Sequence, residues 1–384
     1  MPTISITDNM RAMIRQRAKS KGRKIFIGLS GGVDSAVSAA LLKREGYDVT
    51  GVFIKVWQPD WISCTWKEER RSAMRVAAHL DIPFATLDLT NEYKESVIDQ
   101  MIKEYALGRT PNPDVVCNRY VKFGGFWKWA EAQGADLIAT GHYARVAGDE
   151  ASGYSLLAGA DTNKDQSYFL WTLDQDDLPH ILFPVGDMTK PEVRKLARKF
   201  GLPNAEKKDS QGLCFIGKVD VKDFLSHYIE TKAGNVLDGH GEIIGTHPGA
   251  LFFTNGERHG FTITGKTPND APFYVIDKDV EQNTITVSNK EPGAISSPGS
   301  GSLVRIANVN WIGGKVPDAP DDQDGQWPLQ ARSRYRQTLQ NVRIASVGIA
   351  ETELEFEKPQ DALSPGQSLV IYDGNRCLGG GIIE

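Results

Sequence analysis

The chain has 384 residues, of which 40% are hydrophobic and 24% are charged, as in a globular protein of two or three domains. No apolar run approaches the length of a membrane helix, and residues 1–23 lack the apolar core of a secretory signal. We therefore expect a cytoplasmic protein with no membrane partner. The net charge of −5 argues mildly against nucleic acid as a partner, so local basic clusters would have to bind it.

Residues 24–35 read KIFIGLSGGVDS, an apolar strand followed by a turn with two glycines and the start of a helix that ends at Gly46. Glycines let backbone N–H groups approach an anion, and a helix N-terminus favours negative charge. No lysine follows the second glycine, so the loop is not of the kinase type. The string SGGVDS resembles instead the pyrophosphate loop of enzymes that split ATP into AMP and pyrophosphate; a plain strand-to-helix turn is the alternative. The predicted nucleotide-binding residues of this loop are Gly28, Leu29, Ser30, Gly31, Gly32, Val33, Asp34 and Ser35.

A second glycine-rich string, GFTITGKT at residues 260–267, matches the common phosphate-loop pattern letter for letter. That pattern binds phosphate only when a helix follows the loop. Here Pro268 follows at once and Pro272 comes soon after, and proline blocks a helix interior. We therefore interpret Lys266 as a turn residue.

From Lys24 to Gly141 apolar strands alternate with helical stretches, which predicts an α/β fold with a doubly wound parallel sheet. Ligands bind such sheets beyond the carboxyl ends of the strands, where SGGVDS and TGHY both fall. A helix with a capping box at Thr189 and Glu192 follows. From Gly234 onward the chain reads as short strands, divided near residues 291–302. The predicted organisation is an extension (1–23), a catalytic nucleotide-binding domain (24–225), a central small β domain (226–292) and a C-terminal β domain (293–384).

The four cysteines lie far apart and form no C-x-x-C pair, which fits a reducing compartment and offers no zinc-ligand spacing. We expect no metal held by a set of protein ligands. Cys117 follows TPNPDVV, and a helix predicted to begin near Asn118 would favour its thiolate. Asp114 could share its cavity as an acid, a base or a metal ligand. Cys214 lies in KKDSQGLCFIG, where glycines suggest mobility and lysines would lower the thiol pKa.

A free cysteine is most often a small buried hydrophobic residue, and we place Cys64 and Cys377 in that class. Cys377 lies in a run predicted to be a strand, and Cys64 precedes a predicted helix.

Two basic clusters could bind RNA. Residues 190–208 hold seven lysines and arginines against two glutamates. Residues 331–343 hold four arginines and no acid, with Arg332, Arg334 and Arg336 predicted on one strand face and Tyr335 on the other. Such residues suit phosphate contact and base stacking, although charged faces are often simply solvated.

Seven strings in order, SGGVDS, TPNPDVVCN, TGHYAR, NKDQSYFLW, KKDSQGLCFIG, RYRQ and LGGGIIE, resemble the bacterial tRNA-specific 2-thiouridylases, a family of pyrophosphate-loop enzymes. The resemblance runs from about Lys24 to Glu384 and implies that the last domain is a β-barrel. It also implies a reaction: sulfur replaces O2 of the wobble uridine (position 34) of tRNA after adenylation of that oxygen by ATP, with Mg²⁺. Ala36 stands where the family commonly has a second serine, GERHGFTITGK differs from the usual form, and residues 1–23 have no counterpart.

The resemblance also implies roles for single residues. Cys214 would carry a persulfide received from a sulfur-relay protein or cysteine desulfurase, Cys117 would cleave or resolve the S–S bond, and Asp114 would act beside the base. Ile54 and Gly141 would line the adenosine. The implied partner is the anticodon arm of lysine, glutamate and glutamine tRNAs. Its expected contacts are Asn112, Pro113, Asp114, His142, Lys164, Asp165, Gln166, Arg334, Tyr335 and Gln367.

Two alternatives stay open. One is a pyrophosphate-loop ligase or amidotransferase acting on a small molecule, against which the β domains and the arginine-rich segment argue. The other is a catalytically silent RNA-binding protein, against which the presence of Cys117, Cys214 and Asp114 argues. Release of AMP only in the presence of tRNA would separate the three.

Overall fold

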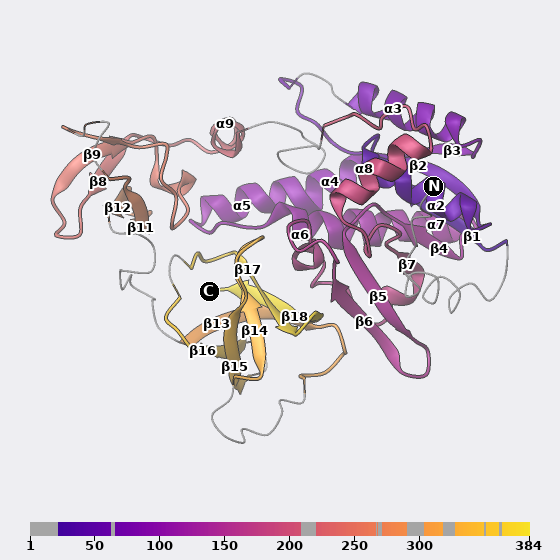
Figure 1. Cartoon of the computed structure of the whole chain (residues 1–384). Helices are drawn as coiled ribbons and strands as arrows, with labels where there is room; N and C mark the ends of the chain where they lie inside the picture. Colours follow the sequence, from indigo (N-terminus) through magenta and orange to yellow (C-terminus); the bar gives the residue numbers. More distant parts are fainter. Residues whose placement is uncertain are drawn as a thin grey trace.

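The computed structural model consists of an α/β domain, a small β domain beside it and a β-barrel below (Figure 1). The residues that it describes are 22–62, 66–208, 220–265, 267, 271–289, 303–317, 327–348, 351–360 and 363–384. The predictions for Cys64, Cys214, Lys266, residues 1–21 of the extension and the divider at 291–302 lie outside these residues.

The α/β domain is built on a parallel sheet of β1 (Lys24–Gly28), β2 (Asp48–Lys55), β3 (Phe84–Asp88), β4 (Leu137–Ala139) and β7 (Ile181–Leu182). Its strand order is β3-β2-β1-β4-β7, and each neighbouring pair is parallel. The chain therefore winds outward in both directions from β1, which confirms the predicted doubly wound sheet.

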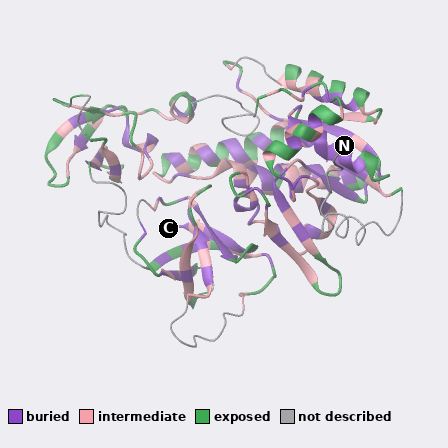
Figure 2. Ribbon diagram, in the orientation of Figure 1, coloured by how far each residue is buried: buried purple, intermediate pink, exposed green. Residues whose placement is uncertain are grey.

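Helices cover both faces of this sheet. On one face lie α2 (Val33–Arg44), α3 (Trp66–His79) and α8 (Lys190–Lys199). On the other lie α4 (Thr90–Tyr93), η1 (Lys94–Asp99), α5 (Gln100–Ala106), α6 (Pro113–Cys117), η2 (Asn118–Gly125) and α7 (Phe126–Ala132). Residues of β1 alternate between the two cores, with Ile25 and Ile27 in the first and Phe26 in the second. The buried residues in Figure 2 follow these two layers.

The predicted capping box of α8 is confirmed, because Thr189 and Glu192 satisfy each other's backbone N–H groups. Val193 and Ala197 are fully buried, as their spacing predicts. Two short 3₁₀ turns, η3 (Ser167–Phe169) and η4 (Leu178–His180), complete the domain.

The central domain begins with α9 (Val221–Ser226) and contains a sheet of order β10-β9-β8-β12-β11. Its elements are β8 (Gly234–Leu237), β9 (Ile243–His247), η5 (Ala250–Phe252), β10 (Thr262–Ile263), β11 (Tyr274–Asp279) and β12 (Thr284–Ser288). Strand β10 lies inside GFTITGKT and pairs with β9, and the next described element is β11. This string therefore contributes an edge strand.

The C-terminal domain is a barrel. Its strands are β13 (Leu303–Trp311), β14 (Leu329–Arg332), β15 (Gln340–Val347), β16 (Glu351–Phe356), β17 (Ser368–Asp373) and β18 (Arg376–Ile383). Pairing of β13 with both β16 and β18 closes it, which confirms the barrel that the family resemblance implies. The LGGG run lies in β18, and a Cβ at Gly379 would lie 2.0 Å from the Asn310 carbonyl oxygen. Glycine is required for this close approach.

The barrel sheet extends into the α/β domain. The hairpin β5 (Ala144–Asp149) and β6 (Gly153–Ala158) joins it because Leu156 and Leu157 pair with Cys377 and Arg376. Cys377 is buried, and burial raises the pKa of its thiol to about 12. The prediction that Cys377 is a small buried residue is confirmed.

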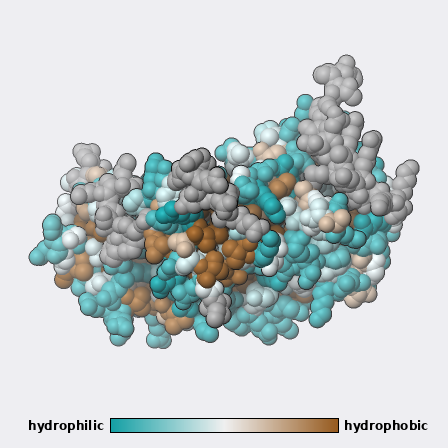
Figure 3. All heavy atoms as spheres, turned by 90° about the horizontal axis from the view of Figure 1, so that it is seen from below, coloured by the Kyte–Doolittle hydropathy of each residue, from teal (hydrophilic) through white to brown (hydrophobic). Residues whose placement is uncertain are grey.

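The face seen in Figure 3 is mostly hydrophilic, with hydrophobic side chains gathered near its middle. No helix in the described residues is long and apolar enough to cross a membrane.

A buried ion pair fastens the barrel to the segment that follows the hairpin. Arg332 donates to Asp165 at 2.5 Å, and only 8% and 7% of these two side chains are exposed. Asp165 also accepts bonds from Gly159 and Ser167, and Arg332 also donates to Tyr372 at 2.8 Å. The Asp165 carboxylate is thus used inside the protein. These internal bonds give Asp165 a supporting role in the fold, and its expected contact with tRNA stays a prediction.

Asp165→Ala should lower the free energy of unfolding by about 3 kcal/mol, because it leaves the Arg332 guanidinium buried without its charge partner. Urea unfolding followed by tryptophan fluorescence measures the loss. Glu351→Ala is the matched control, since it breaks an exposed barrel pair with Arg305 and should cost less than about 1 kcal/mol. Equal losses in the two variants would contradict the role assigned to the buried pair.

Candidate nucleotide and nucleic-acid site

Side chains from other parts of the domain hold the glycine-rich loop in place by donating hydrogen bonds to its carbonyl groups. Asn204 donates to the Gly31 and Gly32 carbonyls at 3.0 and 2.9 Å, and Ser72 and Lys207 also donate to Gly31. Gly31 has φ +76°, and a Cβ there would lie 2.6 Å from the Glu69 carbonyl oxygen. Gly32 is the N-cap of α2 and has no side chain to cap the helix. The first-turn N–H groups are therefore arranged as in an anion site.

Side chains of the loop divide into anchors and polar groups. Leu29 and Val33 are buried in the core, so only their backbone can face a ligand. The Ser35 hydroxyl lies 3.3 Å from that of Ser30 and donates to the Gly32 carbonyl. These bonds fix the loop's shape, and nucleotide binding by its residues remains a prediction.

Gly141 lies directly against the start of α2. A Cβ at this position would lie 2.6 Å from the Ser35 nitrogen and 2.8 Å from the Asp34 carbonyl carbon. Ile54 is buried near the carboxyl end of β2, the neighbour of β1. Gly141, Ile54 and the loop therefore lie at the same edge of the sheet, where such folds bind ligands.

A lysine that sequence reasoning assigned to the RNA cluster lies in this site. The Lys190 ammonium is 2.7 and 2.8 Å from the two Asp34 carboxylate oxygens. The Tyr143 hydroxyl donates to Asp34 at 2.8 Å. Only 13% of the Lys190 side chain is exposed. The loop therefore has a cation beside it that can contact a phosphate.

One signal for this role was present in the sequence. Lys190 is the first residue of a helix whose capping box is readable, and the helix dipole disfavours a cation there. A lysine at such a position suggests an anionic partner elsewhere in the fold.

Cys117 does not lie at a helix N-terminus. Helix α6 runs from Pro113 to Cys117 with Asn112 as its N-cap, and the π-helical turn η2 continues it. The predicted start near Asn118 is therefore wrong, and so is the dipole argument for the thiolate. Proline suits the first helical position, and the favoured anion is Asp114 in the first turn.

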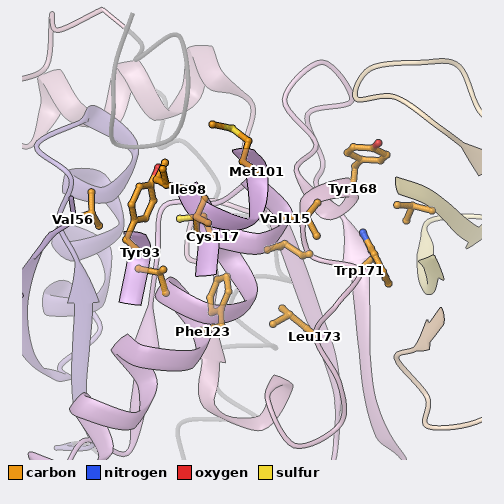
Figure 4. Close-up of a cluster of buried hydrophobic side chains, with 14 of the residues drawn as sticks. Val56, Tyr93, Ile98, Met101, Val115, Cys117, Phe123, Tyr168, Trp171 and Leu173 are labelled. Carbon is orange, nitrogen blue, oxygen red and sulfur yellow. The ribbon is translucent and has the colours of Figure 1, made fainter. Parts of the chain in front are cut away.

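The Cys117 thiol is fully buried in the apolar core. Figure 4 shows its sulfur pointing toward Tyr93 and Ile98, with Phe123 below. Asp114, one helical turn earlier, is partly exposed. The two side chains lie on one side of α6 because they are three residues apart. Cys214 lies outside the described residues, so the approach of Cys214 to Cys117 stays a prediction.

His142 is buried in the turn after β4, between Phe123 and Phe183, and its Nδ1 lies 2.7 Å from the Thr140 hydroxyl. Burial holds the His142 pKa well below its usual range, and the charge of Lys122 lowers it further. The imidazole is therefore neutral at pH 7.

Residues expected at the anticodon loop are tied to this turn. Gln166 exchanges two hydrogen bonds with Tyr143, one through its side chain and one through its backbone. Lys164 is partly exposed. The structure thus brings His142 and residues 164–166 together.

The predicted arginine strand ends at Arg332, and residues 333–336 form a bend and turn. Arg332, Arg334 and Arg336 therefore do not share a strand face. Arg332 is in the buried ion pair, Arg334 donates to the Asn255 carbonyl of the central domain, and Arg336 is exposed. Tyr335 packs on Phe169 with ring centroids 4.8 Å apart. The Gln367 side chain donates to the Thr110 carbonyl at 2.8 Å.

The basic cluster at 190–208 is also partly used inside the protein. Arg194 donates to two backbone carbonyls, Arg198 pairs with Glu206, and Lys207 donates to Gly31. Together with Lys190, four of its basic residues have internal partners. The cluster is a weaker RNA footprint than its sequence indicates.

Comparison with known proteins gives matches along almost the entire chain. The model of the tRNA methyl transferase HUP domain matches residues 23–218, and that of the tRNA methyl transferase PRC-barrel domain matches 222–289. The aminomethyltransferase β-barrel domain matches 302–383. The tRNA-specific 2-thiouridylase of Thiobacillus denitrificans is 44% identical over 94% of this chain and 99% of its own length. The enzyme of the same name from Nitrosococcus oceani is 43% identical over 94% of this chain and 96% of its own.

Lys190→Met should weaken ATP binding roughly tenfold to a hundredfold, because a charge-assisted bond to phosphate contributes about 1.5–3 kcal/mol. Isothermal titration with ATP measures the change. Lys195→Met, on the exposed side of the same helix, is the control and should bind ATP normally. Unchanged affinity in the Lys190 variant would show that this lysine only neutralises Asp34.

Proposed function

Because this chain belongs to the family of the tRNA-specific 2-thiouridylases, we propose that it replaces the C2 oxygen of the wobble uridine of tRNA with sulfur, using ATP. The observation that carries the proposal is the physical continuity between the glycine-rich loop and the Cys117 helix. Gly141 contacts the loop, the adjacent His142 contacts Phe123, and Phe123 lies in the turn that continues α6. An activating nucleotide and a sulfur-handling segment can therefore serve one substrate.

The chemistry needs a leaving group. The C2 oxygen attacks the α-phosphate of ATP, pyrophosphate leaves, and the oxygen becomes part of a bound AMP ester. The terminal sulfur of a Cys214 persulfide then attacks C2, and AMP departs with the oxygen. Attack of the Cys117 thiolate on the Cys214 sulfur breaks the S–S bond, leaves sulfur on the base and forms a disulfide. A thiol reductant from outside the protein restores both thiols.

Asp114 is the residue that we place beside the base. It lies in the first turn of α6, where the helix dipole stabilises its carboxylate, and it is partly exposed. Asn112 and Pro113 would contact the same base. Cys117 is buried, so its attack requires α6 to move when the substrate binds. Exclusion of water from the substrate-bound site would protect the activated base from hydrolysis.

The chain's own residues suit ATP. The uncapped N-terminus of α2, the close contact of Gly141 and the Lys190 ammonium form a cradle for phosphates. Mg²⁺ usually binds through one or two carboxylates and the substrate phosphates. Asp34 can supply one carboxylate once its lysine turns to phosphate. In the described residues no group of three or more His, Cys, Asp or Glu side chains could hold a metal by itself.

The proposed partners are the anticodon arms of lysine, glutamate and glutamine tRNAs and a cytosolic sulfur-relay protein or cysteine desulfurase. His142, Lys164 and Gln166 would lie near the anticodon loop, and Arg334, Tyr335 and Gln367 would lie farther along the arm. The wobble base must leave its stack before C2 is reached, which costs roughly a few kcal/mol and least in a single-stranded loop.

Asp34→Ala should abolish tRNA-dependent pyrophosphate release and leave the fold intact, because it removes the acid that positions Lys190 and completes the loop. Release is followed by a coupled phosphate assay with and without unmodified tRNA. Pyrophosphate released by the natural protein without tRNA, but with a small-molecule acceptor, would favour a ligase or amidotransferase instead. Near-normal release by the variant would refute the site.

Substitutions of the individual cysteines should have different effects on sulfur acceptance and on thiolation. Cys214→Ser should take no labelled sulfur, whereas Cys117→Ser should take it without completing thiolation. Cys377→Ser should stay active, because its buried thiol is protonated at neutral pH. Labelled sulfur on the protein and 2-thiouridine in digested tRNA are the two measurements. A Cys377→Ser variant that accepts sulfur but cannot thiolate would overturn the assignment to Cys117.

A further inference from the structure

All three domains meet at Thr110, a buried residue that lies just before the Asn112–Asp114 segment. Its N–H donates to the Pro365 carbonyl of the barrel at 2.8 Å. Its own carbonyl accepts the bond from the Gln367 side chain, also at 2.8 Å. Its hydroxyl lies 3.2 Å from that of Thr254 in the central domain. Every polar group of Thr110 is therefore bonded to another domain.

The fit of the barrel against Thr110 is tight. A Cβ at Gly366 would lie 2.9–3.0 Å from three backbone atoms of Thr110, and Gly366 has φ +92°. The loop that carries Gly366 is itself held in place, because the Gly366 N–H donates to the Ile383 carbonyl in β18. The central domain adds a bond of its own, from the Asn255 side chain to the Leu363 carbonyl.

The chain is stiff on both sides of Thr110. Before it, Arg109 makes two bonds to Glu104 and fixes the exit from α5. After it, Pro111 and Pro113 flank Asn112, whose side chain caps α6 by accepting from the Val115 N–H. Proline fixes φ, so little slack separates Thr110 from Asp114. A displacement at Thr110 would therefore reach the segment proposed to act on the base.

We propose that Gln367 and Thr110 are positioning residues, through which the seating of the barrel and the central domain sets the place of the Asn112–Asp114 segment. The inference rests on the proposed function and adds to it. The two β domains complete the active site in addition to binding RNA. Gln367 acts through the Thr110 carbonyl, so its removal impairs the reaction of bound tRNA more than the binding of tRNA.

The experiment measures two quantities with full-length protein and unmodified tRNA: the tRNA dissociation constant by filter binding, and the single-turnover rate of pyrophosphate release at saturating tRNA. Gln367→Ala should lower that rate roughly tenfold to a hundredfold, as expected for a small misplacement of reacting groups. The loss of tRNA affinity should be the smaller of the two effects, even though Gln367 is also among the proposed tRNA contacts. Gln340→Ala is the matched control and should behave as the natural protein, because the Gln340 side chain donates to the nearby Thr338 carbonyl of its own domain.

A second pair of variants, at Thr110, tests the hydroxyl group separately from the methyl group. Thr110→Val removes the hydroxyl and should slow the reaction, whereas Thr110→Ser retains the bond to Thr254 and should preserve the rate. Thr254→Val should add little to Thr110→Val, because both remove the same bond. Thr110→Ser also serves as the folded reference if the valine variant is unstable.

Weaker tRNA binding with an unchanged saturating rate in Gln367→Ala would overturn the proposal and leave Gln367 as an RNA contact only. Equal rates in Thr110→Val and Thr110→Ser would overturn the part assigned to the central domain. Failure of the natural protein to make 2-thiouridine would instead refute the proposed function, so the two failures are distinguishable.

Discussion

The contact between Gly141 and the start of α2 is the constraint on which the arrangement of the site depends. No side chain fits there, because a Cβ would lie 2.6 Å from the Ser35 nitrogen. The approach brings the turn after β4 onto the glycine-rich loop, so Tyr143 reaches Asp34. Tyr143 in turn holds Gln166, and the next residue back, Asp165, holds Arg332 of the barrel. A short series of contacts thus links the loop to the barrel.

This linkage changes how the β domains should be viewed. A barrel joined by a flexible tether would bind RNA independently of the nucleotide site. Here β6 pairs with β18, a buried ion pair lies beside that seam, and Thr110 bonds both β domains. Buried ion pairs add little net stability compared with apolar packing, but breaking one is costly. Their geometric demands suit a joint that must keep one orientation.

The sequence predicts well those features that depend on residues close together in the chain. The glycine-rich loop, the α8 capping box and the alternating strands are local patterns, and they appear at the expected places. Partners far apart in the chain were not predictable in this way. The basic clusters around Lys190 and Arg334 are similar in sequence, yet Lys190 pairs with Asp34 and Arg334 donates to the Asn255 carbonyl. Their charge was readable, but their direction was set by tertiary packing.

The error at Cys117 has a different origin. The prediction starts the helix near Asn118, whereas Pro113 occupies the first position of α6 behind an asparagine cap. The local preferences for an asparagine cap and for proline at the first helical position are sufficient to place this helix. The same letters, N-P-D, thus encode a cap, a helix start and a first-turn acid.

Burial alone does not distinguish the two described thiols, because Cys117 and Cys377 are both almost completely buried. Cys377 lies in a strand paired on both sides, near the Asp165 charge, which helps to raise its pKa. Cys117 ends a five-residue helix and is followed by a π-helical turn, in which a Cβ at Gly124 would lie 2.8 Å from the Arg119 carbonyl oxygen. Such turns cluster at functional sites and have a less regular hydrogen-bond ladder than an α-helix. A shift of register there would move Cys117 without breaking a sheet, whereas exposing Cys377 would require the barrel seam to open. The backbone that holds Cys117 is therefore less regular than the doubly paired strand that holds Cys377.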